Sequence, residues 1–455
     1  MRKFYSALFY VGLPIAIQHL VISSGTLMDN FMVTGLGKES IAAVGAIDKF
    51  VRIFWFIIFG VSSAGSTFIG QAKGRGDRRV LGNTVGIILT INVAFALLFT
   101  SLSLFFPNQI ASFAAPSDGV VRKLAANYLF FLSLSYIPSV LSTTISYTLR
   151  GVGNTKPIVY SSLIFVSSNV LLNYLFIFGS CGFPALGVNG AAMATAISKI
   201  IETLFVLIYL YFMGIKVLDN FIDLFNFNKK LMLNIVGVSV PYGLSGGLLS
   251  TGFFMYQAFF GQFGANAMAA YAIVTMMEAF VMNLFHGISG GVLILLSQDI
   301  GHREYSEAYE DAKRSIRVAL ISSSLIGLSL YMVSNSLVRK YALLAASIKG
   351  EELSEGSVLL AIYMIQILSL LLPLKVFNLV SLHGIIKSGG DAFALLLIEN
   401  GSLWLFGIPL LYIISISPIN SALAIYIALY FEEAIKAIWS WKRVKSREWD
   451  RSLID

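Results

Sequence analysis

The sequence has little charge, one cysteine and few histidines. Charged residues make up 12% of the 455 residues, about half of the ~25% usual in soluble domains. The single cysteine, Cys181, excludes an internal disulfide and any site with several cysteine ligands, and four scattered histidines argue against a histidine-rich metal site. A Walker phosphate-binding loop is also missing, so we expect no direct use of ATP and no bound cofactor.

Hydrophobic residues fill most of the chain instead, at 57%. A helix that crosses a hydrocarbon layer of ~30 Å needs ~20 apolar residues, and the chain holds enough for about twelve such helices. This composition argues against a soluble enzyme, a disordered chain and a nucleic-acid-binding domain. The formal net charge of +8 then fits cytoplasmic loops of a membrane protein, and we expect a lipid bilayer, not nucleic acid, as the surroundings.

Twelve apolar runs separated by short polar breaks predict twelve transmembrane helices. They cover residues 6–35, 41–70, 80–106, 124–149, 157–179, 185–213, 231–262, 266–298, 312–336, 357–386, 392–416 and 420–440. Helices are expected because lipid offers no partner for unpaired backbone groups, and the runs do not alternate as barrel strands would. The first run is far longer than the apolar core of a signal peptide, so we interpret it as a permanent span.

Lysine and arginine are distributed unequally between the two sides of this arrangement. Of the 32 basic residues, 22 fall on the side of the two termini, eight fall on the other side, and Lys199 and Lys375 lie within spans. Cytoplasmic loops carry the excess of basic residues in membrane proteins. We therefore expect a multi-pass protein of the inner (plasma) membrane with both termini in the cytoplasm.

The chain repeats internally. Residues 14–76 align with residues 241–303 without a gap, at an offset of 227, and the later pair 153–154 and 390–391 aligns at an offset of 237. Six predicted spans in each half give both halves the same orientation, so a pseudo-two-fold axis along the membrane normal should relate them. We predict an N-terminal six-helix lobe (1–214), a cytoplasmic linker (215–230), a C-terminal six-helix lobe (231–440) and a basic tail (441–455).

Short motifs in a fixed order accompany this plan. They are Leu13-Pro14 with Asp29 fifteen residues later, Gly35-Leu36-Gly37, Ala42-Ala43-Val44-Gly45, Gln71-Ala72-Lys73-Gly74, the stretch Leu149–Pro157 and the stretch Leu186–Thr195. In these motifs and in its two-lobe plan, the chain resembles the multidrug and toxic compound extrusion (MATE) family over nearly its whole length. The resemblance implies a secondary antiporter that exports bulky cationic or amphipathic drug-like compounds in exchange for Na⁺ or H⁺, and we expect a monomer.

Asp29 is the clearest candidate for a coupling group. Charges inside spans are costly, and Asp29 lies about 25 residues into the first run with no basic residue nearby in sequence. Gln18 and Gly25 share its helical face. One interpretation is an ion- or proton-binding carboxylate, and the other is a structural carboxylate near the external mouth.

The fifth and sixth spans carry the expected partners of Asp29. Asn169 and Asn173 are four residues apart, hence on one helical face, and their amide oxygens suit Na⁺. In one branch of the family, the ion site joins the first-span Asp to an Asn, a second Asp four residues later and a Thr of the sixth helix. Asn169 and Thr195 match that pattern, whereas Asn173 stands where the second Asp would be. The resemblance thus implies a Na⁺ or H⁺ site at these four residues.

Further charged residues lie within spans. Lys199 and Glu202 are three residues apart and either form a structural ion pair or take part in gating or substrate access. Glu278 is the main acidic candidate of the second half, for a cationic substrate or for a proton. Lys375 is a partner for either Glu278 or Glu399. The seventh-span glutamate of other family branches is absent, because Leu249 occupies that position.

Two rival functions fit the sequence less well. A lipid-linked oligosaccharide flippase of the same superfamily would need a strongly cationic centre, and only Lys199 and Lys375 are available within spans. A membrane-embedded enzyme would need clustered catalytic side chains near one interface, and the sequence has no such motif. The expected coupling ion is either Na⁺ or H⁺. His286 and His383 are interpreted as packing residues of their helices.

Overall fold

The computed structural model describes residues 2–115, 118–212, 228–349 and 353–455, and all elements of this part are helical. Contacts divide the chain into two compact units. The N-terminal unit holds Leu13–Gly243 with Ser452–Asp455, and the C-terminal unit holds Leu244–Arg451 with Met1–Gly12. Of the predicted linker 215–230, residues 215–227 lie outside the described residues.

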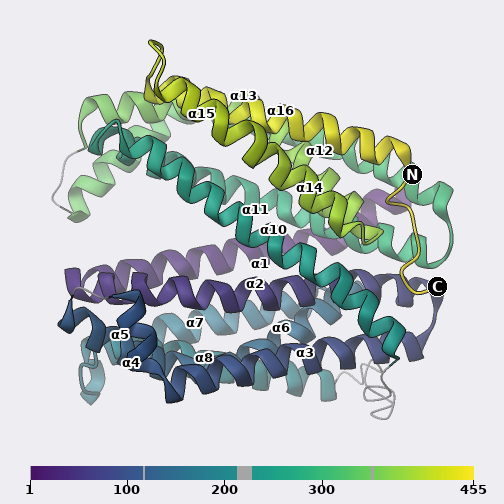
Figure 1. The fold of residues 1–455 in the computed structure, drawn as a ribbon, viewed down its shortest axis with the longest axis horizontal. Coiled ribbons are helices and arrows are strands. Elements are labelled where there is room, and N and C mark those ends of the chain that lie inside the picture. Colours follow the sequence, from purple (N-terminus) through teal and green to yellow (C-terminus); the bar gives the residue numbers. More distant parts are fainter. Residues whose placement is uncertain (1, 116–117, 213–227, 350–352) are drawn as a thin grey trace. The chain divides into compact units, whose positions relative to one another are not determined.

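Helices of the first half of the chain form the N-terminal unit (Figure 1). They are α1 (Arg2–Thr34), α2 (Lys38–Arg75), α3 (Arg78–Phe105), α4 (Pro107–Ala114), α5 (Gly119–Ser133), α6 (Tyr136–Gly151), α7 (Lys156–Phe178), the short η1 (Ser180–Gly182) and α8 (Val188–Phe212), with the first turns of α10 (Lys229–Gly261). The first turns of α1 and the last turns of α10 belong to the other unit.

A second set of helices forms the C-terminal unit. They are α11 (Ala265–Gly301), α12 (Tyr305–Lys349), α13 (Glu355–Leu379), α14 (Ala392–Ser402), α15 (Ile408–Ser415) and α16 (Ala422–Ser446), with the π-helical segments η2 (Val380–Ile386) and η3 (Leu403–Gly407). The segment η3 immediately precedes Ile408-Pro409. Because a proline ring cannot fit against the carbonyl four residues earlier, the wider π-turn there relieves that clash.

The predicted all-helical membrane fold is confirmed. Within the described residues, nine helices are long and apolar enough to cross a membrane, or ten if the bent pair α5 and α6 forms one span. Each of the twelve predicted spans coincides with a helix or an interrupted helix, and the count of twelve and the pseudo-two-fold axis stay predictions. The α5–α6 pair bends by 48° at residues 134–135, four residues before Pro138, whose ring disfavours a continuous helix there.

Each unit has its own apolar core. In the N-terminal unit, Phe54 packs between Phe99 and Tyr136 where α2, α3 and α6 meet. In the C-terminal unit, a larger cluster joins α10, α11, α13 and α16, with Phe260 stacked on Tyr271 at 4.1 Å. Long helices that bury one face in such a core leave the other face apolar and exposed, as lipid contact requires.

Candidate functional site

A close approach of α1 to α7 places Asp29 beside the asparagine pair. Gly25 lies one turn before Asp29, and a Cβ atom there would meet Val166 Cγ2 at 2.8 Å. Only glycine allows this approach, because Val166 is β-branched and has little rotamer freedom in a helix. Asn169 and Asn173 follow Val166 on α7, so the helices bring them to the level of Asp29.

The four predicted coupling residues form one hydrogen-bonded chain. Asn173 Nδ2 donates to Asp29 Oδ1 at 2.6 Å and lies 3.2 Å from Asn169 Oδ1. Asn169 Nδ2 in turn donates to Thr195 Oγ1 at 3.4 Å, and the Thr195 hydroxyl donates to the Ala191 carbonyl at 3.0 Å. The chain therefore joins a carboxylate on α1, two amides on α7 and a hydroxyl on α8.

Among these hydrogen-bonded residues, the amides are more deeply buried than the carboxylate. Asn169 and Asn173 are each 2% exposed, whereas Asp29 is half-buried. A carboxylate at the edge of a buried amide pair can exchange a proton or an ion with water, while the amides hold it in position. Hard oxygen ligands of this kind suit an alkali cation, and the carboxylate alone suffices for a proton.

Gln18 takes part in a different contact. It lies three turns before Asp29 on α1 and accepts a hydrogen bond from Arg150 at the end of α6. The Arg150 guanidinium also lies 5.0 Å from the ring centroid of Tyr147. The structure therefore places Gln18 with a half-buried arginine, and the shared helical face predicted for Gln18 and Asp29 does not make them contact the same partners.

Lys199 and Glu202 form an ion pair on α8 at 2.8 Å. The Lys199 ammonium also lies 3.7 Å from the ring centroid of Phe165 on α7. Of the two interpretations of these residues, this geometry favours the structural ion pair, because both side chains are largely buried and neutralise each other.

Glu278 pairs with Lys375 in the C-terminal unit. The carboxylate on α11 and the ammonium on α13 form an ion pair, with side-chain exposures of 22% and 17%. The ammonium also lies 5.2 Å from the ring centroid of Tyr430 on α16. Of the two partners considered for Lys375, the structure selects Glu278.

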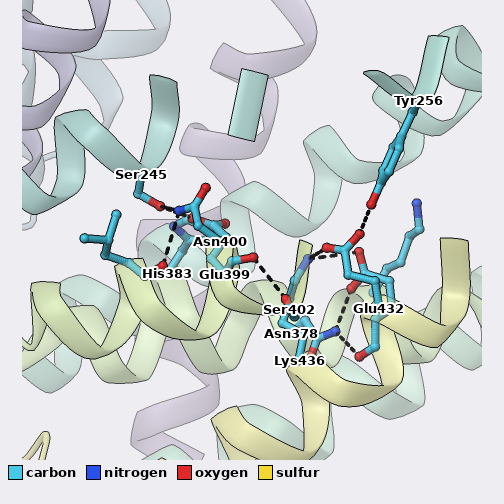
Figure 2. Close-up of polar contacts among 12 residues, drawn as sticks. Ser245, Tyr256, Asn378, His383, Glu399, Asn400, Ser402, Glu432 and Lys436 are labelled. Atoms are coloured by element: carbon cyan, nitrogen blue, oxygen red, sulfur yellow. Dashed lines mark hydrogen bonds and ion pairs between the residues drawn. The ribbon is translucent and has the colours of Figure 1, made fainter. Parts of the chain in front are cut away.

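Glu399 belongs to a buried polar network that the sequence analysis missed (Figure 2). Its Oε1 lies 3.0 Å from His383 Nε2 on η2, and its Oε2 accepts a hydrogen bond from Ser245 on α10 at 2.5 Å. Asn400 Nδ2 donates to the same Ser245 hydroxyl at 2.8 Å. We call this set, together with the α16 group described next, the C-terminal polar network.

The second part of this network centres on Lys436. Its ammonium lies 2.8 Å from Glu432 and 3.3 Å from Glu433, and Tyr256 donates to Glu432. Asn378 Nδ2 donates to Glu433 at 2.6 Å. Glu432, Glu433 and Lys436 fall near the cytoplasmic end predicted for the span 420–440, where Lys436 was counted with the basic residues of that side, and these three charges were the available signal for this group.

Within the described residues, no group of three or more His, Cys, Asp and Glu side chains could hold a metal ion. The hydrogen-bonded set of Asp29, Asn169, Asn173 and Thr195 is not a site of that type, because its members other than Asp29 are two amides and a hydroxyl. Neutral oxygen ligands of this kind suit an alkali cation, which is the type of metal ion that these four residues could bind.

Comparison with protein families gives one clear result. The family model described as MatE matches residues 14–175 and again residues 241–413. The two matches begin 227 residues apart, which is also the offset of the internal repeat. The repeat found in the sequence is therefore a repeat of this family unit.

Related proteins match two thirds of the chain or more. An uncharacterized transporter of Bacillus subtilis, YisQ, is 23% identical over 449 residues, which cover 97% of this chain and 94% of YisQ. A probable multidrug resistance protein of the same organism, YoeA, is 28% identical over 326 residues, which cover 69% of this chain and 67% of YoeA. A probable multidrug resistance protein NorM of Synechocystis is 22% identical, and the match covers 96% of this chain and 94% of NorM.

Solved structures share the fold. A crystal structure of MATE in complex with MaL6 has a TM-score of 0.85 at 19% identity. The match covers 97% of this chain and 96% of the MATE chain. The Vibrio cholerae MATE transporter VcmN has a TM-score of 0.86 at 17% identity, with coverages of 99% and 98%. The arrangement of helices is thus that of known transporters.

Proposed function

The chain belongs to the MatE (multidrug and toxic compound extrusion) family and is a multi-pass membrane protein, and from this premise we propose that it is a multidrug efflux antiporter. It exports bulky cationic or amphipathic drug-like molecules by alternating access, in exchange for Na⁺ or H⁺. Its relatives named as multidrug resistance proteins support this proposal. We further propose that it acts as a monomer in the inner (plasma) membrane, with cytoplasmic termini.

The observation that carries the proposal is the hydrogen-bonded chain from Asp29 to Thr195. A carboxylate inside a span needs a functional or structural reason, and here it accepts a hydrogen bond from a neutral amide. Binding of a cation or proton would neutralise Asp29 and release the Asn173 amide from it. Because Asp29 is on α1 and the amides are on α7, this release would change how the two helices pack, and so link ion binding to the conformation.

We propose that Na⁺ and H⁺ compete for this one site. Asp29, Asn169, Asn173 and Thr195 together offer one carboxylate, two amide oxygens and a hydroxyl, and backbone oxygens or water would complete a shell for Na⁺. The single formal charge balances either ion. Since the amide nitrogen of Asn173 faces Asp29 in the structure, binding of Na⁺ requires that amide to turn its oxygen toward the ion.

Heat stability of the purified protein tests this assignment. Na⁺ at about ten times its Kd should stabilise the folded protein by about 1.4 kcal/mol. We expect this protection at alkaline pH, where protons do not compete, and we expect Asp29→Asn to abolish it. The absence of sodium protection in the wild type, with full export driven by a pH gradient alone, would make the site a proton site.

A matched control separates the effect of where the carboxylate lies from the effect of the net charge of α1. Asn30 is the exposed neighbour of Asp29 on α1, so the double variant Asp29→Asn with Asn30→Asp keeps the composition and moves the carboxylate by one residue. One residue is about 100° around the helix, which carries the carboxylate away from Asn173. Sodium protection that survives in this variant would contradict the proposed site.

The rival proposal, a lipid-linked oligosaccharide flippase, finds less support in the structure. It requires cationic side chains available to a pyrophosphate, yet the ammonium groups of Lys199 and Lys375 are both held in ion pairs with glutamates. Binding of an anionic lipid would have to break these buried pairs, at a cost of several kcal/mol each. An antiporter for cationic compounds requires no such rearrangement.

A further inference from the structure

The residues that follow α16 divide between the two compact units. Helix α16 ends at Ser446, residues up to Arg451 belong to the C-terminal unit, and residues 452–455 belong to the N-terminal unit. The peptide chain between Arg451 and Ser452 therefore joins one group of contacts in each unit. These residues are not part of the proposed site at Asp29, so their contacts need a separate explanation.

Residues 447–451 form the first group of contacts, which we call the C-terminal anchor. The Trp449 side chain is fully buried, and Gly389 leaves the space into which the Trp449 carbonyl oxygen fits. Arg451 lies 3.4 Å from Asp391, whose side chain is 4% exposed. Withdrawal of a buried tryptophan would return a large apolar surface to water, which is costly. We therefore expect the C-terminal anchor to stay in place.

Residues 452–455 form the second group of contacts, and we call them the latch segment. The backbone N–H of Leu453 donates to Gln71 Oε1 at 2.8 Å, and the Arg75 guanidinium donates to the carbonyl oxygen of Ile454 at 3.1 Å. The Ile454 side chain packs against the apolar cluster that α2 and α3 form in the N-terminal unit. The last turns of α2 thus provide both a polar and an apolar partner for the latch segment.

The latch segment is held less firmly than the C-terminal anchor. Its first three residues are half-buried, and Asp455 is exposed. The ion pair between Arg75 and Asp455 is also open to water, with side-chain exposures of 27% and 43%, and ion pairs of this kind contribute little to stability. Of the two groups of contacts, the latch segment is therefore the one that can leave its partners and bind them again.

The length of chain between the two groups limits the movement that both can tolerate. Only Ser452 separates Arg451 from Leu453 in the sequence, and an extended chain spans at most ~3.3–3.6 Å per residue. Both groups of contacts can therefore exist together only while their attachment points stay within reach of this short segment. A movement that separates the attachment points further must release the latch segment, because it is the weaker of the two.

We propose that the latch segment is releasable: bound to α2, it restrains separation of the two units on the side of the membrane where α16 ends, and it leaves α2 when the units separate there. This inference rests on the alternating access proposed above. It assigns a role to Gln71, from the motif 71–74, and to Asp391, from the repeated pair 390–391. Neither residue belongs to the site at Asp29.

Hydrogen exchange of the full-length protein in nanodiscs tests whether the latch segment binds α2. The Leu453 amide should exchange at least about tenfold more slowly than an unstructured amide, because it donates to the fully buried Gln71. Ile454→Ser removes the apolar contact and should speed this exchange by at least about fourfold, the factor for one buried CH₂ group. Ser452→Ala is the matched control in the same segment and should leave the rate unchanged.

Distances between spin labels test whether the latch segment restrains the two units. Arg79, near the start of α3, and Glu304, just before α12, are exposed and belong to different units. Both are replaced by labelled cysteines after Cys181→Ser, and double electron–electron resonance gives the ratio of longer to shorter distances. Ile454→Ser should raise this ratio up to about fourfold. Deletion of residues 452–455 should raise it further, and Ser452→Ala should not change it.

The outcomes separate this proposal from the antiport proposal. A wild-type Leu453 amide that exchanges like an unstructured one would overturn the latch, and so would an equal distance ratio in the wild type and the deletion variant. Asp29→Asn should keep the protection of Leu453, because it leaves the latch contacts in place. Failure of the antiport proposal would instead appear as no gradient-driven export by the wild type while the Leu453 amide stays protected.

Discussion

Replacement of Gly25 by alanine should disable the Asp29 site without touching any of its polar groups. The new Cβ would lie 2.8 Å from Val166 Cγ2 and 3.0 Å from Cγ1, whereas carbon atoms pack at about 3.5–4.0 Å. The two helices must therefore separate by about 0.7–1.2 Å at this level. The hydrogen bond from Asn173 to Asp29, now 2.6 Å, would lengthen to about 3.3–3.8 Å and be strongly weakened.

The energetic effect has two opposing parts. Overpacking costs about 1–3 kcal/mol, and replacing a helical glycine by alanine returns up to about 1 kcal/mol. We therefore expect a net loss of stability of about 0–3 kcal/mol, together with a loss of sodium protection and of drug export. Thermal unfolding of the purified protein with and without Na⁺, followed by transport in proteoliposomes, measures both effects.

A double-variant cycle tests the cause. Val166→Ala removes the atoms that the new Cβ would meet, so the pair Gly25→Ala with Val166→Ala should recover sodium protection and export. Gly45→Ala is the matched control, because Gly45 on α2 has open space at its Cβ position. Unchanged sodium protection in Gly25→Ala, or no recovery in the double variant, would refute the argument that close helix approach positions Asp29.

Two further predictions concern the C-terminal unit. Glu278→Gln leaves the half-buried Lys375 ammonium without its ion-pair partner, so the melting temperature should fall, by less than the equivalent of the about 3–5 kcal/mol typical of a fully buried pair. Adding Lys375→Met should restore most of it, and a single variant as stable as the wild type would contradict the pairing. Gly389→Ala would place a Cβ directly against the carbonyl oxygen of Trp449, whose side chain is fully buried. That tryptophan should become accessible to acrylamide quenching, and unchanged quenching would contradict the contact.

Most of the fold could be predicted from the sequence because the membrane restricts the choices. Apolar runs such as 6–35 and 266–298 became α1 (Arg2–Thr34) and α11 (Ala265–Gly301), since an apolar run in lipid has no alternative to a helix. Interruptions within the runs were not predicted. The bend between α5 and α6 and the π-helical segments depend on how a proline or a polar side chain is accommodated by neighbouring helices, which hydrophobicity does not encode.

The candidate site, too, could be predicted from the sequence only in part. The asparagine pair and its relation to Asp29 could be anticipated, because residues four apart share a helical face and the family pattern names the partners. The partner of Lys375 could not be chosen, because Glu278 and Glu399 were both available and tertiary packing decided between them. The His383–Glu399 pair was missed for the same reason, since its members are sixteen residues apart on different helical segments.

Transport by Asp29→Asn in proteoliposomes tests the central claim most directly. Vesicles with the wild type or the variant receive a sodium gradient or a pH gradient, each imposed separately, and movement of a fluorescent cationic drug is followed. The wild type should move the drug against its concentration gradient under at least one of these gradients, and Asp29→Asn should show no gradient-driven movement while its folding is intact. Gradient-driven transport by Asp29→Asn equal to that of the wild type, or no response of the wild type to either gradient, would contradict the account.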